Sequence, residues 1–407
     1  MGVRLTTRFR RAAGWTALVL PWALPAAVVP PAGHADPPER YRVTAAPARA
    51  DRYIVRLTED ARPASVLSRL GLRPVYVYTK VMNGFAVPLT AQQLTVMLRQ
   101  PEVTAIESDG VVRAPAAPGP AVRPPAPGAA RTAPTTSWGL DRIDQRALPL
   151  DGSFRAVHRG AGVTAYVVGT GIDPRGGDLA GRVDPGYSVV ADGLGSGDCG
   201  GQGTFAAGIL GGTRSGVAPA VRLVPVRVLG CGGTGTYSAA IAGLEWIAGN
   251  LRRPAVAVLT FSGPESPMLN DAANGLTYLT ILLAGGAGDG GADACDTSPG
   301  SAAGPLTIAA STETDRPAAF SGRGPCVDVY APGVDVASAG PGGAVRQGSG
   351  TGYAAAYAAG TAALFKDLYG DASSVTVIRW ITGNATTGAL RDVPAATPNR
   401  LLFTDGL

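Results

Sequence analysis

The stretch Val163-Thr-Ala-Tyr-Val-Val168 decides the fold, because it is a short apolar run without a charged residue. Such a run is typical of a strand that is buried on both faces of a parallel sheet. Mostly apolar runs of the same kind follow at 221–228, 255–261 and 280–284, and helical patterns lie at 203–211, 237–249, 352–368 and 373–383. This alternation predicts an α/β fold with a mainly parallel sheet between two layers of helices.

A smaller unit precedes this region, at 51–113. Its strand-like and helix-like patterns follow the order β-α-β-β-α-β, which is typical of a small sheet with helices on one face. The next segment, 114–136, is dense in Pro, Ala and Gly and has no hydrophobic period. We predict that it is an extended linker that a protease can cut, and that 137–407 forms one larger domain.

The first 35 residues have the pattern of an export signal. An arginine-rich start is followed by the apolar run 12–29 and by Ala32-Gly-His-Ala35, which fits a signal-peptidase cleavage site. We therefore predict a secreted protein without a membrane anchor. The formal net charge is +5, and the four arginines of the signal, which has no acidic residue, account for four of these five units. No basic patch with interleaved aromatic residues remains, so nucleic acid is not a predicted partner.

The chain has four cysteines, an even number that predicts disulfides in an exported protein. A zinc site would favour a close pair such as C-x-x-C, and the sequence contains none. We predict two bridges between consecutive cysteines, formed by Cys199, Cys231, Cys295 and Cys326.

Several motifs of the larger region occur in a fixed order. Ser137-Trp-Gly-Leu-Asp-Arg-Ile-Asp144 opens it, and Val221–Leu229, Cys326-Val-Asp-Val-Tyr-Ala-Pro-Gly333 and Pro398-Asn-Arg-Leu-Leu402 follow. These motifs resemble the subtilisin-like serine proteases, and most of all their proteinase K and aqualysin branch. The resemblance implies a three-layer subtilisin-like fold, preceded by a ferredoxin-like α+β prodomain of the inhibitory type at 51–113. It also implies the disulfide pairs Cys199–Cys231 and Cys295–Cys326.

The same resemblance locates the family's catalytic positions, where this chain carries other residues. Peptide hydrolysis of this type needs a hydroxyl nucleophile, an imidazole base and an orienting carboxylate. The family's Asp, His, oxyanion Asn and Ser are matched here by Gly169, Gln202, Gly286 and Gly352. Glycine has no side chain, and a carboxamide does not take up a proton near neutral pH. We therefore predict a catalytically inactive serine peptidase homologue, a pseudopeptidase.

Two other interpretations stay open. The first is a serine endopeptidase or other hydrolase with relocated catalytic residues, which would use His158, since the remaining histidine, His34, lies in the signal. No serine motif accompanies His158, and we interpret it as a surface or turn residue. The second is a stable fold that has lost any role.

In the family, a bound peptide lies as an added strand between two backbone segments. The resemblance places this groove at Gly232, Gly233, Thr234, Gly235, Thr236, Tyr237, Thr260, Phe261, Ser262 and Gly263. Backbone hydrogen bonds need no catalytic side chain, so we expect the groove to bind an extended peptide or another protein. Phe205, Tyr353 and Tyr357 replace smaller or polar family residues nearby, and they either fill the empty site or contact a ligand.

No cofactor is predicted. Asp289, Asp293 and Asp296 lie where this branch can hold calcium, but Thr312 stands in place of a calcium-binding Asp of the family, so a structural calcium ion has no support. Without catalytic residues the chain cannot cut itself. We therefore expect the prodomain to stay attached, with its tail near 111–115 in the groove, unless another protease cuts the linker.

Overall fold

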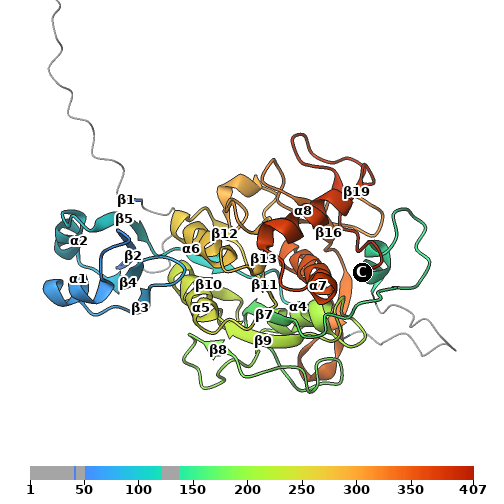
Figure 1. The fold of residues 1–407 in the computed structure, drawn as a ribbon, viewed down its shortest axis with the longest axis horizontal. Helices are drawn as coiled ribbons and strands as arrows, with labels where there is room; N and C mark the ends of the chain where they lie inside the picture. Colours follow the sequence, from blue (N-terminus) through green and yellow to red (C-terminus); the bar gives the residue numbers. More distant parts are fainter. Residues whose placement is uncertain (1–40, 43–50, 122–136) are drawn as a thin grey trace, which may run out of the picture. The chain divides into compact units, whose positions relative to one another are not determined.

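The computed structural model describes residues 41–42, 51–121 and 137–407 (Figure 1). The predicted export signal and residues 122–136 of the predicted linker lie outside the described residues.

A nine-stranded sheet forms the centre of the larger region, in the order β19-β20-β16-β15-β13-β11-β7-β9-β8. Each pair of neighbours in it is parallel except β19 with β20. The predicted apolar runs are confirmed as strands with shifted ends: β7 (Thr164–Gly169), β9 (Arg222–Arg227), β11 (Ala255–Leu259) and β13 (Leu282–Gly286). The other strands are β8 (Tyr187–Ser188), β15 (Leu306–Ser311), β16 (Val329–Pro332), β19 (Thr386–Thr387) and β20 (Arg400–Leu401).

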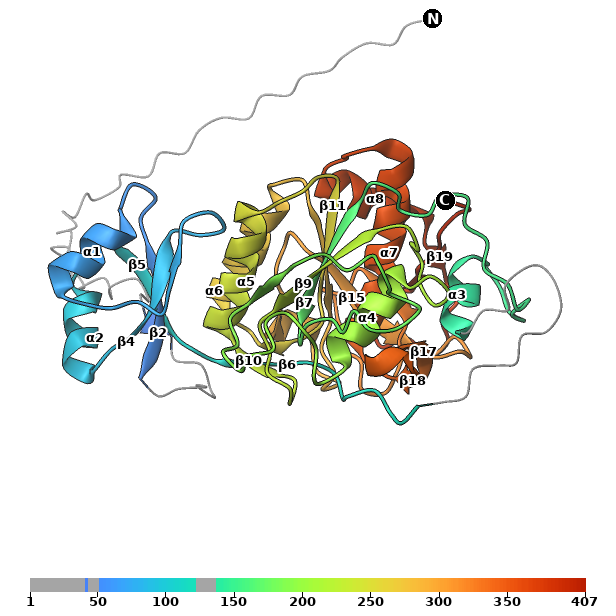
Figure 2. The ribbon, with the colours of Figure 1, turned by 90° about the horizontal axis from the view of Figure 1, so that it is seen from below.

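Helices cover both faces of this sheet (Figure 2). Alternate residues of β7 point to opposite faces: Ala165 and Val167 pack with α4 and α7, whereas Tyr166 and Val168 pack with α5 and α6. The predicted helices are confirmed as α4 (Gln202–Gly211), α5 (Tyr237–Gly249), α7 (Thr351–Tyr369) and α8 (Ser374–Asn384). The sequence patterns missed α3 (Trp138–Ile143) and α6 (Pro267–Thr277).

The smaller unit has the predicted β-α-β-β-α-β order. It comprises β2 (Arg52–Leu57), α1 (Pro63–Leu70), β3 (Tyr76–Tyr78), β4 (Gly84–Pro88), α2 (Ala91–Leu98) and β5 (Val103–Ser108). A short strand that was not predicted, β1 (Tyr41–Arg42), pairs with β5. One face of this sheet packs against α1 and α2. The other face contributes Ile54 and Ala86 to the core that contains residues of α5 and α6.

Candidate functional site

The four positions matched to catalytic residues lie at the ends of strands and the starts of helices. Gly169 ends β7 and Gly286 ends β13, while Gln202 begins α4 and Gly352 is the second residue of α7. The carboxyl ends of parallel strands meet at one edge of a sheet, where α/β proteins usually bind their ligands. A Cβ added to Gly169 would lie 2.1 Å from Thr260 Oγ1, and one added to Gly352 would lie 3.2 Å from Thr260 Cα. Thr260 is thus the common neighbour of two of these positions.

The space beside two of the glycines is already filled. Thr260 Oγ1 donates a hydrogen bond to the carbonyl of Val168 at 3.0 Å and occupies the place of a Cβ on Gly169. A Cβ on Gly286 would lie 2.5 Å from Thr351 Oγ1 and 2.9 Å from the backbone nitrogen of Gly352. Interiors are packed too tightly for such contacts. A larger residue at either position therefore requires its neighbours to move.

Gln202 is buried where the family has its imidazole. Its Oε1 has no hydrogen-bond partner within the described part of the chain. A Cβ added to Gly233 of the predicted groove would lie 2.7 Å from Gln202 Nε2. Asp198 caps the same helix by accepting hydrogen bonds from the backbone nitrogens of Gly201 and Thr204, both at 2.8 Å. The helix is therefore well anchored, but its first residue has no group that can act as a base.

A carboxylate lies at the start of α7, next to Gly352. Asp289 Oδ1 accepts a hydrogen bond from the backbone nitrogen of Thr351 at 2.7 Å. Burial is the main cause that raises the pKa of Asp289, against this hydrogen bond, which lowers it. The positive end of a helix can stabilise an oxyanion during acyl transfer. Here the ionised form of Asp289 would oppose a second negative charge at that place.

The predicted peptide groove holds a segment of the same chain. β6 (Val111–Arg113) pairs antiparallel with β10 (Thr234–Thr236). On the other side, Arg113 and Ser262 exchange two backbone hydrogen bonds of 2.8 and 2.9 Å. Ala114 continues the contact by donating its N–H to the carbonyl of Gly233 at 2.8 Å. The tail of the smaller unit thus lies as an added strand between the two predicted segments, where we expected it.

The same segment continues past Gly352. Pro115 is buried, and its Cγ would lie 3.2 Å from a Cβ on Gly352. The hydroxyl of Tyr353 then donates to the carbonyl of Ala116 at 2.9 Å. Further along, the N–H of Gly119 donates to the carbonyl of Gln347 in β18 (Val345–Gly348) at 2.8 Å. Residues 111–121 therefore occupy the groove on both sides of Gly352.

The three aromatic residues singled out in the sequence have different surroundings. The rings of Phe205 and Tyr353 contact each other at a centroid distance of 4.6 Å, and both are fully buried. Tyr357 lies under α3, where its hydroxyl shares a 2.9 Å hydrogen bond with Ser137 Oγ. Burial raises the pKa of both tyrosine hydroxyls well above the ordinary range. The packing interpretation therefore fits Phe205 and Tyr357, whereas Tyr353 also holds the tail.

His158 lines a pocket in which the described residues place no serine or cysteine. Its Nδ1 lies 3.9 Å from Asp367 Oδ2, in a pocket of about 280 Å³ whose described lining contains neither serine nor cysteine. The hydroxyl residue of that lining, Thr213, donates its hydroxyl to the carbonyl of Asp178 at 3.0 Å. A hydrolase based on His158 thus gains no support from this arrangement.

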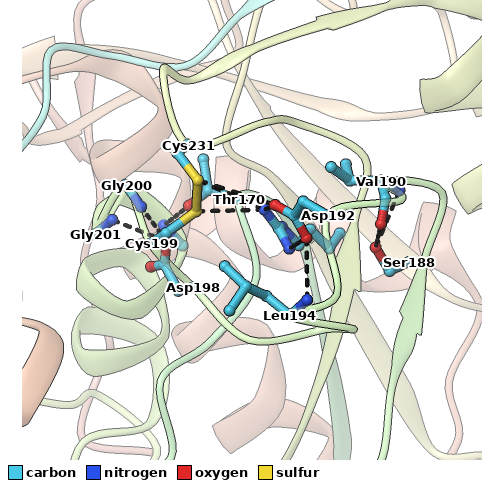
Figure 3. The surroundings of a disulfide bond; sticks show 12 residues. Thr170, Ser188, Val190, Asp192, Leu194, Asp198, Cys199, Gly200, Gly201 and Cys231 are labelled. Atoms are coloured by element: carbon cyan, nitrogen blue, oxygen red, sulfur yellow. Dashed lines mark hydrogen bonds and ion pairs between the residues drawn. A yellow bond between two sulfur atoms is a disulfide. The ribbon is translucent and has the colours of Figure 1, made fainter.

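The structure contains both disulfides in the pairing that the resemblance implies, Cys199–Cys231 and Cys295–Cys326. Figure 3 shows the first one beside Asp192. The buried Arg227 donates to Asp192 Oδ1 at 2.8 Å and lies 3.3 Å from Cys199 Sγ. The Cys199–Cys231 disulfide fixes the loop before α4 to Cys231, which directly precedes the groove segment 232–237. Asp192, Cys199 and Cys231 lie close enough together to suggest a metal site. However, both sulfurs are joined in the disulfide and Asp192 pairs with Arg227, so these side chains are not available as metal ligands.

The aspartates considered for calcium do not converge on one point. Asp289 caps α7, as described above, and Asp293 Oδ1 accepts a hydrogen bond from the backbone nitrogen of Cys295 at 2.9 Å. Among the described residues, neither they nor Asp296 belong to a group of three ligand-type side chains within 4.8 Å.

Carboxylates hold the smaller unit on two helices of the larger region. Asp109, just before β6, accepts hydrogen bonds from the backbone nitrogen and the hydroxyl of Ser238 at 2.9 and 2.6 Å. Glu107 accepts from the backbone nitrogen of Met268 at the start of α6 at 3.1 Å. Conversely, Glu245 of α5 accepts from backbone nitrogens of the turn at 79–81. These contacts anchor the segment that enters the groove, and sequence patterns gave no signal for them.

Comparisons with known proteins agree with this architecture. Residues 160–403 match the model of the subtilase family, and residues 52–115 match that of the peptidase inhibitor I9 family. The chain is 37% identical over 347 residues to an extracellular serine proteinase of Thermus sp. (strain Rt41A), covering 85% of this chain and 81% of the relative. It is 36% identical over 369 residues to alkaline serine exoprotease A of Vibrio alginolyticus, covering 87% and 67%.

A solved structure shows the same fold. The crystal structure of a cold adapted subtilisin-like serine proteinase superposes with a TM-score of 0.64 at 39% identity, covering 66% of this chain and 97% of that one. In the described ranges, no helix has the length and apolar character needed to span a membrane.

Proposed function

Because the chain belongs to the subtilase family and carries its I9-type prodomain, we propose that it is a catalytically inactive member that works by binding. The observation that carries this proposal is the filled space at two matched positions. Thr260 takes the place of a side chain at Gly169, and the first residues of α7 take the place of one at Gly286. This packing supports the proposal, because a larger side chain at either position would require its neighbours to move.

The expected loss of activity is large. Removal of a serine protease triad lowers turnover by about 10⁶. Loss of one oxyanion donor lowers it by a further factor of about 10² to 10³, although such effects do not add fully. The carboxylate of Asp289 at the start of α7 works in the same direction, because it disfavours a developing oxyanion.

The proposed ligand is an extended peptide or a segment of another protein, bound by strand addition. Support comes from the tail at 111–114, which forms such a strand with Gly233, β10 and Ser262. A ligand can enter only when this tail leaves, so the prodomain would regulate access. Since the chain is predicted to lack self-cleavage, release would require another protease to cut the linker at 114–136. The relative named as an extracellular serine proteinase supports the predicted secretion.

The test uses the secreted full-length chain from a host that lacks its own extracellular proteases. We expect no labelling by a fluorophosphonate probe, no turnover of a chromogenic peptide, and an intact mass that includes the prodomain. A sample cut in the linker by an added protease should then bind extended peptides that the uncut sample does not bind. Inhibitor-sensitive turnover or self-generated cleavage would contradict the proposal and favour a hydrolase with relocated residues.

A further inference from the structure

A pocket of about 560 Å³ lies between the end of α6 and the start of α8, and the proposed function leaves it unused. Its wall combines hydroxyl and amide side chains with an exposed aromatic ring and one arginine. The residues that line it are Asn274, Thr277, Tyr278, Thr280, Ala303, Gly304, Ser373, Ser374, Val375, Ile378 and Arg379. This volume falls within the range of pockets that bind small organic molecules.

The charge of this wall is positive. Arg379 is its one charged residue, and its guanidinium has no hydrogen-bond or ion-pair partner within residues 51–121 and 137–407. The nearest acidic residue along the chain, Asp371, is already paired with Lys366 and with Arg253. An arginine without a partner, in a wall without a carboxylate, favours an anionic ligand.

The start of α8 adds donors to the same pocket. The first N–H groups of a helix have no partner within the helix, and here Ser374 and Val375 lie at that point of the wall. Ser374 is only 4% exposed, and its Oγ has no hydrogen-bond partner in the described part of the chain. The Oγ1 of Thr280, in the opposite wall, also has none. Both hydroxyls therefore keep a free donor beside the pocket, which a side-chain rotation could direct toward a ligand.

Lys366 connects the segment at Thr280 to the segment that leads into α8. The buried Lys366 Nζ donates to the carbonyl of Thr280 at 2.8 Å and to that of Ala372 at 2.9 Å. At the rim, Tyr278 is 83% exposed and Val375 is 56% exposed. The segment at Thr280 and the segment before α8 are therefore tied together through Lys366, and Tyr278 and Val375 add exposed apolar surface to the lining.

We propose that this pocket binds a small organic anion. A carboxylate or phosphate group would lie against Arg379 and the start of α8, and an apolar or aromatic body would lie against Tyr278 and Val375. The site is separate from the peptide groove, so it does not depend on the proposed function.

The test is calorimetric titration of the full chain with phenyl phosphate, benzoate and benzylamine. We expect saturable one-to-one binding of phenyl phosphate or benzoate, whose relative affinities decide between the two anionic groups, and none of benzylamine. Arg379→Gln should weaken binding about tenfold, because it removes a charge-assisted hydrogen bond. Ser374→Ala should weaken it about threefold through loss of a neutral hydrogen bond.

The matched control is Arg391→Gln, which alters an exposed arginine outside the pocket and should leave binding unchanged. The proposal would be overturned if neither anion saturates the protein or if benzylamine binds as well as the anions. It would also be overturned if Arg379→Gln and Ser374→Ala both bind as tightly as the unmodified chain. Should Arg379→Gln fail to fold, Ser374→Ala decides alone.

Discussion

The peptide groove and the four matched positions lie next to each other but depend on different parts of the chain. The groove binds the tail through backbone groups of Gly233, β10 and Ser262, and these hydrogen bonds involve no catalytic side chain. Catalysis depends on particular side chains, and a Cβ at Gly169 or Gly286 would lie 2.1 Å from Thr260 Oγ1 or 2.5 Å from Thr351 Oγ1, so its neighbours would have to move. Strand addition can therefore outlast catalysis in the same fold, because the backbone remains when side chains change.

The largest expected effect concerns the four matched positions. We expect the variant Gly169→Asp, Gln202→His, Gly286→Asn, Gly352→Ser to stay at background turnover, about 10⁶ below a working triad. The new Cβ atoms at 169 and 286 would meet Thr260 Oγ1 and the backbone of Gly352. Turnover of a chromogenic peptide after cutting of the linker measures this.

Adding Thr260→Ala to that variant tests the close contact at 169 separately from the close contact at 286. It removes the contact at 169 but leaves the one between 286 and the backbone of α7, so turnover should still be at background. Gly352→Ser alone is the comparison for folding, because its Cβ would lie 3.2 Å from Pro115 Cγ and Thr260 Cα, a tight contact that requires a smaller shift than the contacts at 169 and 286. Inhibitor-sensitive turnover in the restored chain would show that only side chains, and not packing, separate this protein from a peptidase.

The next largest effect concerns the groove. Arg113→Pro removes the N–H that bonds to the carbonyl of Ser262 and leaves that carbonyl without its partner. We expect a cost of about 2 kcal/mol, or about a 30-fold increase in opening of the tail. Hydrogen exchange of peptides from 111–121 measures it, with the core strand 255–259 as internal reference.

Arg113→Ala is the control, because it keeps the N–H and removes only an exposed side chain with one long hydrogen bond, 3.4 Å to Thr234 Oγ1. Its exchange should match that of the unmodified chain. Equal opening in both variants would mean that the side chain, and not the backbone, holds the tail, and the contrast between groove and catalytic positions would fail.

A smaller effect is expected where the tail is anchored. Asp109→Ala removes the acceptor of two hydrogen bonds from Ser238 at the start of α5. Loss of such a cap costs about 1 kcal/mol. Exchange of 111–121 should therefore increase less than in Arg113→Pro, while Asp109→Asn, which keeps one acceptor, should lie between Asp109→Ala and the unmodified chain. If Asp109→Ala increases exchange of 111–121 more than Arg113→Pro does, the contacts of Asp109 outside the groove stabilise the bound tail more than the groove does.

Much of the fold was predictable because buried parallel strands are apolar runs, as in β7 and β11. The missed helix α6 begins with Pro267 and contains Asn270, Asn274 and Gly275, residues of low helix propensity. The matched positions and the tail came from motifs of a resemblance. The filled space beside Gly286 was not predictable, because it depends on where the backbone of α7 lies relative to β13.

The smallest effect concerns the carboxylate that now occupies the catalytic edge. Burial raises the pKa of Asp289 in the folded protein above its ordinary value of about 3.9. The folded state then binds this proton more tightly than the unfolded state, so its contribution to stability grows as pH falls through the raised pKa, and the gain is complete below about 3.9.

Asp289→Asn removes this titration but keeps an oxygen for the N–H of Thr351. We expect the variant to be the more stable form at pH 7, with the difference closing as pH approaches 4 in paired thermal melts. The two proteins share every other titrating group, so the difference isolates Asp289. If the unmodified chain instead loses stability relative to the variant on acidification, attraction between the carboxylate and the start of α7 exceeds the cost of burial. The helix end would then still stabilise negative charge, as an oxyanion site requires, and the groove and the catalytic edge would differ less.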